Sequence, residues 1–274
     1  MNSNSVSLTD WQQHGIVYPL TALSQDEARD AVPQFQSLQH RLADRVDAPQ
    51  YPKVNVASQF ACDLVCNTHI LDAVECLIGP DILCWSATFF AKPAKHPSFV
   101  GWHQDCTYWG LSPVDDVVTV WLGLTDSQID NGCMQSIHGT HTLGQLDHQQ
   151  HTDTPNLLQS GQEVSMTVTQ EMITDIELAP GQFSIHHSRL LHGSAPNHSD
   201  RDRIGLSINY IAAHVQQTSG TDSAMLVRGK SPGHFLPEPK PAGECTEQTL
   251  TAWLKALRSP SGLGRSAKHK ETKV

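Results

Sequence analysis

Residues 203–210 read Arg203-Ile204-Gly205-Leu206-Ser207-Ile208-Asn209-Tyr210, and every second position is apolar. Side chains of a β-strand alternate between the two faces of its sheet, so this stretch predicts a strand with one apolar and one polar face. Burying the arginine on the polar face costs free energy unless it meets an anion, and its planar guanidinium suits a carboxylate. The pattern therefore predicts a sheet whose polar face binds a carboxylate group. The apolar set is Ile204, Leu206, Ile208 and Tyr210, and the polar set is Arg203, Gly205, Ser207 and Asn209.

Further runs rich in β-branched and aromatic residues follow one another through most of the chain. Ahead of them, residues 8–45 and 58–78 favour helices, with Ser24 capping the second helix of the first range. This order predicts a mainly β fold, a barrel or sandwich, with helices added at the front. Two polar stretches, residues 139–162 and 214–243, are predicted to be long loops, which in a compact domain are usually either functional or disordered. The other β-like runs cover residues 82–92, 117–125, 164–169 and 182–187.

The length and composition fit one folded domain. The chain has 274 residues, of which 38% are hydrophobic and 17% charged, and no linker divides it. We expect a single domain over residues 1–255 and a basic, flexible tail over residues 256–274. The net charge is −10, yet the last 20 residues hold six of the 18 Lys and Arg and only one of the 28 acids. An acidic body of this kind repels phosphate backbones, which excludes nucleic acid as the expected partner.

The cysteines and the N-terminal residues indicate in which cellular compartment the protein is expected. Seven cysteines occur without a CxxC pair, and no second Cys or His pair follows Cys62 and Cys66 at zinc-site spacing. Reduced, mostly buried thiols are therefore expected. The chain starts without a basic segment and apolar run, and no stretch reaches the ~18 apolar residues of a membrane span. These features predict a cytoplasmic protein that acts on a small molecule without membrane contact, and they are compatible with a homodimer.

Histidine makes up 16 of the 274 residues, which directs attention to metal binding. In the stretch Gly101-Trp102-His103-Gln104-Asp105, an extended backbone would place His103 and Asp105 on the same face. His192, which follows an apolar run, could add a third ligand. Two histidines and one carboxylate on one side of an ion leave three positions open, which is typical of non-haem Fe(II) oxygenases.

Each of these signals has a plainer interpretation. A His-x-Asp pair arises easily by chance among 16 histidines, and His192 alone fits a core or surface histidine. Arg203 beside Asp200 and Asp202 could form a surface ion pair of little energetic weight. The combination is more specific than its parts, because His192 and then an arginine eleven residues later follow the His-x-Asp pair within β-like sequence.

Three stretches carry a resemblance to a known family: Trp102-His103-Gln104-Asp105, Asp130-Asn131-Gly132-Cys133-Met134 with Ile137-His138-Gly139-Thr140-His141, and residues 192–203. Over most of residues 10–215 the chain resembles the phytanoyl-CoA dioxygenase family of Fe(II)- and 2-oxoglutarate-dependent oxygenases. The resemblance implies a double-stranded β-helix with N-terminal helices packed on it. It also implies that 2-oxoglutarate and O2 are converted to succinate and CO2 while the substrate is hydroxylated.

The resemblance also assigns roles to single residues. A carboxylate at position 105 implies hydroxylation rather than chlorination, since halogenating relatives need a small residue there to admit chloride to iron. One of His186 and His187 is expected to face the site, because the two alternate on a strand. The implied iron ligands are His103, Asp105 and His192, and the implied 2-oxoglutarate contacts are Arg203 at the far carboxylate, Ser194, Trp121 and Lys92.

The substrate is argued from residues 98–111, which are similar to a bacterial branch that includes hydroxylases of small aminophosphonates. This similarity implies 2-aminoethylphosphonate as substrate, hydroxylated at the carbon that bears phosphorus. The alternatives are another small metabolite, such as an amino acid, a compatible solute or a natural-product intermediate, and a non-enzymatic metal-binding barrel of the cupin type. The candidates for a substrate lid and a phosphonate clamp are Tyr108, Trp109, Arg228 and Lys230.

Overall fold

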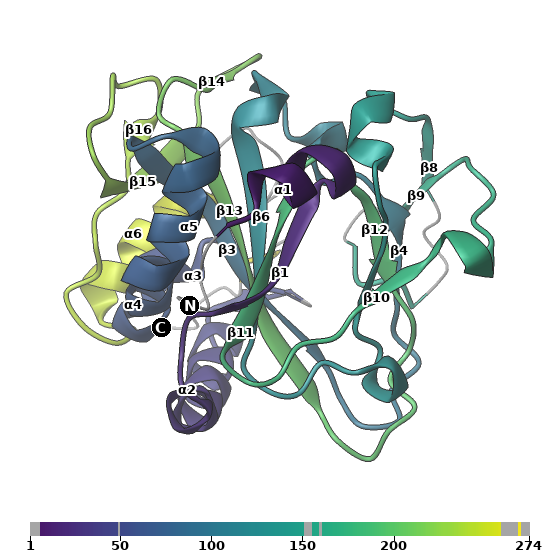
Figure 1. The fold of residues 1–274 in the computed structure, drawn as a ribbon. Helices are drawn as coiled ribbons and strands as arrows, with labels where there is room; N and C mark the ends of the chain where they lie inside the picture. The colour runs from purple at the N-terminus through teal and green to yellow at the C-terminus, as the bar shows by residue number, and fades with distance from the viewer. Residues whose placement is uncertain (1–5, 49, 151–154, 159–160, 259–267, 270–274) are drawn as a thin grey trace.

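Two β-sheets form the centre of the molecule (Figure 1). The computed structural model describes residues 6–48, 50–150, 155–158, 161–258 and 268–269, so most of the predicted tail 256–274 lies outside the described residues. The larger sheet has the strand order β1 (Ile16–Thr21), β11 (Gln182–His187), β6 (Val117–Gly123), β13 (Arg203–Ala212), β3 (Ile82–Lys92), β15 (Ser223–Arg228) and β16 (Leu236–Pro237). The smaller sheet has the order β10 (Thr174–Ile176), β7 (Met134–Ile137), β12 (Leu191–Ser194) and β4 (Val100–His103).

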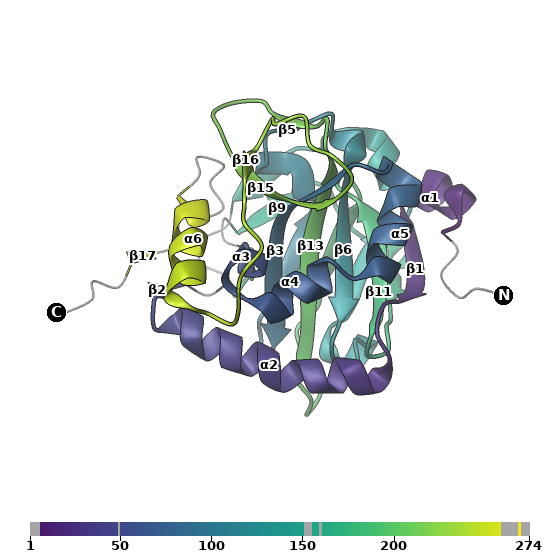
Figure 2. The ribbon, with the colours of Figure 1, turned by 90° about the vertical axis from the view of Figure 1, so that its left-hand side faces the viewer.

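Helices cover one face of the larger sheet, as Figure 2 shows. They are α2 (Gln25–Ala43), α3 (Val54–Ala57), α4 (Gln59–Val65), α5 (Thr68–Ile78) and α6 (Glu247–Leu257), while α1 (Leu8–His14) lies beside β1. No helix in the described part of the chain is long and apolar enough to span a membrane. Three short strand pairs complete the fold: β2 (Val46–Asp47) with β17 (Lys268–His269), β5 (Leu111–Ser112) with β14 (Gln216–Gln217), and β8 (His148–Gln150) with β9 (Gln162–Val164).

The alternation predicted for residues 203–210 is confirmed. Strand β13 lies between β6 and β3 in the larger sheet. Its apolar side chains belong to the main hydrophobic core, together with side chains of the covering helices. Its polar side chains lie on the other face, where Arg203 and Ser207 line a pocket between the two sheets. The architecture is the predicted double-stranded β-helix with added helices.

The helical prediction holds in part. Ser24 caps α2 with a capping box that includes Glu27, as predicted. Residues 58–78 form two helices rather than one, because the Asn67 side chain accepts the backbone N–H groups of His69 and Ile70 and so starts a new helix.

The two predicted long loops contain regular structure. Residues 214–243 supply β15, which pairs with β3 and so extends the larger sheet. Residues 148–150 pair with 162–164 as β8 and β9. Helix α6 was not expected at all, although Thr246 caps it and Trp253 anchors it in the core.

A buried ion pair ties the C-terminal segment to the larger sheet. Lys53 Nζ donates hydrogen bonds to the carbonyl oxygens of Trp85 (2.9 Å) and Ser223 (2.8 Å) and to Glu238 Oε1 (2.6 Å). The Trp85 indole donates to Asp222 Oδ2 at 2.7 Å. Because all these groups are buried, each charge depends on its partners for compensation.

We expect Lys53→Met to lower the free energy of unfolding by about 3–5 kcal/mol, because Glu238 would stay buried without its partner. The control is Arg29→Gln, which removes an exposed ion pair with Asp26 and should cost less than about 1 kcal/mol. Urea unfolding followed by tryptophan fluorescence measures both losses. If both variants lost the same free energy of unfolding, the proposed contribution of the Lys53 hydrogen bonds to stability would be contradicted.

Candidate metal centre

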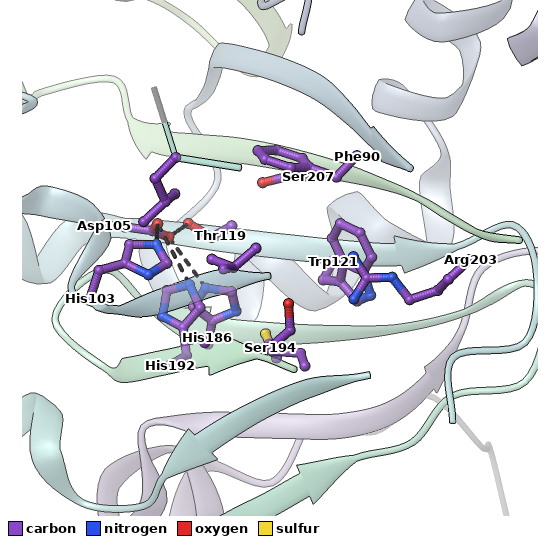
Figure 3. Close-up of a pocket in the computed structure, with 14 residues that line it drawn as sticks. Phe90, His103, Asp105, Thr119, Trp121, His186, His192, Ser194, Arg203 and Ser207 are labelled. Carbon is purple, nitrogen blue, oxygen red and sulfur yellow. Dashed lines mark hydrogen bonds and ion pairs between the residues drawn. The ribbon is translucent and has the colours of Figure 1, made fainter. Parts of the chain in front are cut away.

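The smaller sheet brings two histidines together. His103 ends β4, His192 lies in β12, and the two residues are direct partners across these antiparallel strands. Asp105 lies just beyond the end of β4, in the 3-10 turn Asp105–Tyr108. The sequence predicted extended backbone at this position. Asp105 Oδ1 lies 3.3 Å from His103 Nε2 and 3.7 Å from His192 Nε2. The three candidate ligand atoms lie within 4.8 Å of one another (Figure 3).

The hydrogen bonds of the two histidines orient their rings for metal binding. Nδ1 of His103 lies 2.9 Å from the Gly101 carbonyl oxygen, and Nδ1 of His192 lies 2.9 Å from that of Leu190. A carbonyl oxygen only accepts, so each neutral ring carries its proton on Nδ1 and leaves a lone pair on Nε2. Two Nε2 lone pairs and a carboxylate oxygen therefore converge, and this donor set fits a divalent cation.

The protonation states suit the same role. Burial raises the pKa of Asp105, but interactions with His192, His103 and His186 outweigh it and hold this pKa well below its usual range. Burial and the proximity of His103 lower the pKa of His192 well below its ordinary value. Asp105 is thus ionised and His192 neutral near pH 7, which are the forms that bind metals.

At the far end of the pocket lies a buried arginine. Arg203 is 3% exposed, and its guanidinium lies 4.9 Å from the Trp121 ring centroid. One nitrogen donates to the Gly132 carbonyl oxygen at 2.6 Å, while Nε has no partner among the described residues. Burial lowers the pKa of Arg203 to about 10, so it remains charged at neutral pH. No carboxylate in the described part of the chain pairs with it, as expected of a guanidinium that binds an anionic ligand.

Lys92 lies beside Arg203 but does not line the pocket. The two residues are register partners on β3 and β13. Lys92 Nζ donates to Ser194 Oγ at 2.6 Å and also contacts the Ala195 carbonyl oxygen. Burial and the charge of Arg203 lower the pKa of Lys92 to about 6. Lys92 therefore positions Ser194, whose side chain faces the pocket.

A glycine makes room for Trp121 over the sheet. Gly205 lies on the polar face of β13, and a Cβ there would stand 2.3 Å from Cζ2 of Trp121. The absent side chain leaves space for the indole, which lies between the metal ligands and Arg203 (Figure 3). Its Nε1 is buried and has no partner among the described residues.

The remaining pocket walls were not predicted as site residues. The signal for several of them was available, because they share the polar face of the strands that carry Arg203, Trp121 and Lys92. No such signal marked the segment around Leu158. This segment lies beside β4, where Asn156 Oδ1 accepts the Gly101 N–H, and the two are distant in the sequence. The unpredicted lining residues are Phe90, Val100, Thr119, Met134, Leu158, Gly193 and Ser207.

Gln104, the middle residue of His-Gln-Asp, anchors the loop beside the site. Its buried amide nitrogen donates to the carbonyl oxygens of Gly144 and Arg189, at 2.9 and 2.8 Å. Its amide oxygen accepts the Leu146 N–H at 2.8 Å, and its backbone N–H donates to His148 Nε2. The residue between two candidate ligands thus ties them to the segment that continues to Leu158.

The structure separates the two adjacent histidines of β11. His186 lines the pocket, and its Nε2 lies 3.3 Å from Asp105 Oδ2. His187 points away from the pocket, with Nε2 3.4 Å from Asp115 Oδ1 and its ring 5.8 Å from that of Trp11. His186 is therefore the histidine that faces the site.

The predicted substrate residues do not gather at the pocket. Trp109 packs against Trp85 with ring centroids 5.0 Å apart, and it is not a lining residue. Arg228 is bound to Asp72 and Glu75 of α5, at 2.7 and 2.6 Å, and it does not line the described pocket. The exposed Lys230 donates its backbone N–H to Asp81, also away from the pocket. The Tyr108 side chain lies outside the described part of the structure.

Comparison with known proteins agrees with this site. The sequence model of the family "Phytanoyl-CoA dioxygenase (PhyH)" matches residues 20–205, which include all three candidate ligands and Arg203. The chain belongs to the phytanoyl-CoA dioxygenase family. The resemblance stated from its motifs is thereby confirmed.

The curated proteins that the chain resembles include dioxygenases named for different substrates. The chain is 29% identical over 180 residues to a probable alpha-ketoglutarate-dependent hypophosphite dioxygenase of Stutzerimonas stutzeri, covering 61% of this chain and 60% of that protein. It is 26% identical to the human peroxisomal phytanoyl-CoA dioxygenase, covering 56% and 47%. The chain thus spans only about half to three fifths of these curated relatives.

One solved structure matches nearly the whole chain. The apo form of the non-heme monooxygenase ThoJ has a TM-score of 0.84 and 33% identity, and the match covers 94% of this chain and 97% of that one. A nickel complex of ThoJ matches with a TM-score of 0.79. Because the match covers nearly all of both chains, this chain and that non-heme monooxygenase share the overall architecture.

We expect Gly205→Ala to lower the free energy of unfolding by about 1–3 kcal/mol, because the new Cβ would overlap the Trp121 ring. Ser207→Ala on the same face is the control, since a Cβ is already present there, and it should cost less than about 1 kcal/mol. Urea unfolding gives both values, and near-UV circular dichroism reports movement of the indole. An unchanged spectrum and stability in Gly205→Ala would contradict the tight packing.

Proposed function

We propose that this protein is an Fe(II)- and 2-oxoglutarate-dependent oxygenase that hydroxylates a small molecule and releases succinate and CO2. One observation carries the proposal: two histidines and a carboxylate converge at one end of a pocket whose other end holds a buried arginine without a carboxylate partner among the described residues. The family membership and the alpha-ketoglutarate-dependent relative support the same assignment.

His103, Asp105 and His192 would hold the metal, because their free atoms converge and their other hydrogen bonds are already made. When bound, Fe(II) supplies O2 activation with 2-oxoglutarate as the co-reductant. Three protein ligands from one side leave the opposite positions for co-substrate and O2.

Arg203 would bind the distal carboxylate of 2-oxoglutarate. Its guanidinium is buried and charged, and Ser194 offers a hydroxyl on the same pocket wall. Lys92 holds that hydroxyl in place from behind. A charge-assisted hydrogen bond of this kind contributes about 1.5–3 kcal/mol, and it is made without competing water because the site is buried.

The substrate side of the pocket is largely uncharged. Its walls combine Phe90, Val100 and Leu158 with the hydroxyl of Ser207. Arg203 is the only Arg or Lys among the described lining residues, and its place is at the 2-oxoglutarate end. Because these described walls offer no further cationic side chain, an anionic group of the substrate would have to be neutralised at the metal.

The candidate substrate 2-aminoethylphosphonate is kept as the finer proposal. It is supported by the similarity of residues 98–111 to aminophosphonate hydroxylases and by the hypophosphite dioxygenase relative, which acts on another phosphorus compound. With Arg228 committed to α5, the phosphonate would be neutralised next to the metal rather than by a separate basic clamp.

Anaerobic addition of Fe(II) and 2-oxoglutarate should produce the weak visible charge-transfer band of the chelate. We expect His103→Ala to lose this band, because it removes one of the two converging imidazoles. In Arg203→Met, the 2-oxoglutarate concentration that gives half of the full band should rise about 10- to 100-fold. This is the loss of affinity expected when one charge-assisted hydrogen bond is removed. Arg228→Met is the matched control and should titrate like the unmodified protein. A full band in His103→Ala would refute the metal assignment.

The substrate proposal is tested by succinate release in a panel of small molecules. We expect 2-aminoethylphosphonate to stimulate succinate release above the level without substrate, with loss of the stimulation in His192→Ala. The panel also contains hypophosphite, free amino acids and compatible solutes. Stimulation by one of these and none by any aminophosphonate would reject the phosphonate substrate and leave the reaction class intact.

A further inference from the structure

Three polar residues form a row across the centre of the larger sheet. His186 on β11 is the register partner of Thr119 on β6, and Thr119 is the register partner of Asn209 on β13. The three strands are neighbours, so these side chains stand side by side on one face. They are buried, with exposed fractions of 2%, 3% and 8%. Such a row in the middle of a sheet is costly unless its hydrogen bonds are used.

The row is directed at one oxygen atom of a candidate ligand. Thr119 Oγ1 lies 2.6 Å from Asp105 Oδ2, and His186 Nε2 lies 3.3 Å from the same atom. An ionised carboxylate only accepts, so both groups donate to Oδ2. Asn209 Nδ2 donates to Thr119 Oγ1 at 3.1 Å, which leaves the threonine proton free for Asp105.

The other oxygen of Asp105 has different neighbours. Oδ1 faces Nε2 of His103 and of His192, which belong to the smaller sheet. Asp105 therefore lies between the sheets, with Oδ2 bound by the larger sheet and Oδ1 available to the metal. A carboxylate without such donors can turn and bind a metal through both oxygens, which would occupy a further coordination position.

We propose that Thr119, His186 and Asn209 are positioning residues that fix Asp105 as a one-oxygen ligand and keep the adjacent coordination position free for co-substrate. This inference rests on the proposed metal centre. Thr119 makes the shorter bond, His186 adds a second donor, and Asn209 orients the threonine hydroxyl. Groups that orient a metal ligand in this way typically contribute 10- to 100-fold to metal affinity.

The test measures Co(II) binding to the apoprotein by calorimetry, a readout independent of turnover. Thr119→Val removes the hydroxyl at constant shape, and we expect it to weaken Co(II) binding about 10- to 100-fold. Thr119→Ser keeps the hydroxyl and should restore most of the affinity. Asn209→Ala should weaken binding by a smaller factor, because it acts through Thr119. The visible d–d spectrum of bound Co(II) should also change in Thr119→Val and return in Thr119→Ser.

The matched control is Ser184→Ala. Ser184 stands two residues from His186 on the same face of β11, and its buried hydroxyl has no partner among the described residues. It is not a lining residue of the pocket, so this variant should bind Co(II) like the unmodified protein. Should Thr119→Val fail to fold, His186→Phe keeps a ring beside His192 and removes only the donor, and it should weaken binding several-fold.

The outcomes separate this inference from the proposed function. Unchanged Co(II) affinity and spectrum in folded Thr119→Val or His186→Phe would overturn the positioning role while leaving the metal centre intact. An equal loss in Thr119→Ser would also overturn it, since the hydroxyl is still present there. Absence of Co(II) binding and of the Fe(II)–2-oxoglutarate band in the unmodified protein would overturn both proposals.

Discussion

The placement of one carboxylate, Asp105, governs the candidate site. Two histidines on neighbouring strands can be aligned by sheet register alone, and the register does align His103 with His192. A carboxylate that follows the strand in a turn has no such constraint. Its position is set by hydrogen bonds from the opposite sheet, above all from Thr119 at 2.6 Å. The metal centre therefore depends on the two sheets holding a fixed separation.

The covering helices explain how the sheet can hold that separation. The apolar face of β13 packs against α4 and α5 in the main core, where Leu206, Ile208 and Tyr210 are fully buried. The free energy of folding thus comes mainly from one face. The opposite face can then carry groups that weaken a sheet, such as the glycine under Trp121 and the guanidinium of Arg203, which has no carboxylate partner among the described residues. The polar face of the larger sheet thus depends on the helices that pack against its apolar face.

The sequence was informative wherever local rules determine the structure. Strand alternation correctly placed Arg203 on a polar face, and the Ser24 cap marked the start of α2. The spacing of His103, Asp105 and His192 indicated their convergence, although it could not show that Asp105 lies beyond the strand. Alternation could place Thr119 and Asn209 on a polar face, but it could not show their place beside Asp105, which follows only from register between strands distant in the sequence.

Arg228 shows why substrate residues are harder to predict than metal ligands. A basic residue in a polar segment fits a phosphonate clamp, but β15 extends the larger sheet and directs Arg228 toward the acids of α5. The cationic side chain of the described pocket lining is Arg203, which would meet the distal carboxylate of 2-oxoglutarate. With 2-oxoglutarate bound to Arg203, the described lining offers no further cationic side chain to a substrate. We therefore expect the shape of the pocket to determine much of the discrimination among substrates. Phe90, Val100 and Leu158 are then the side chains whose volumes decide which carbon reaches the centre.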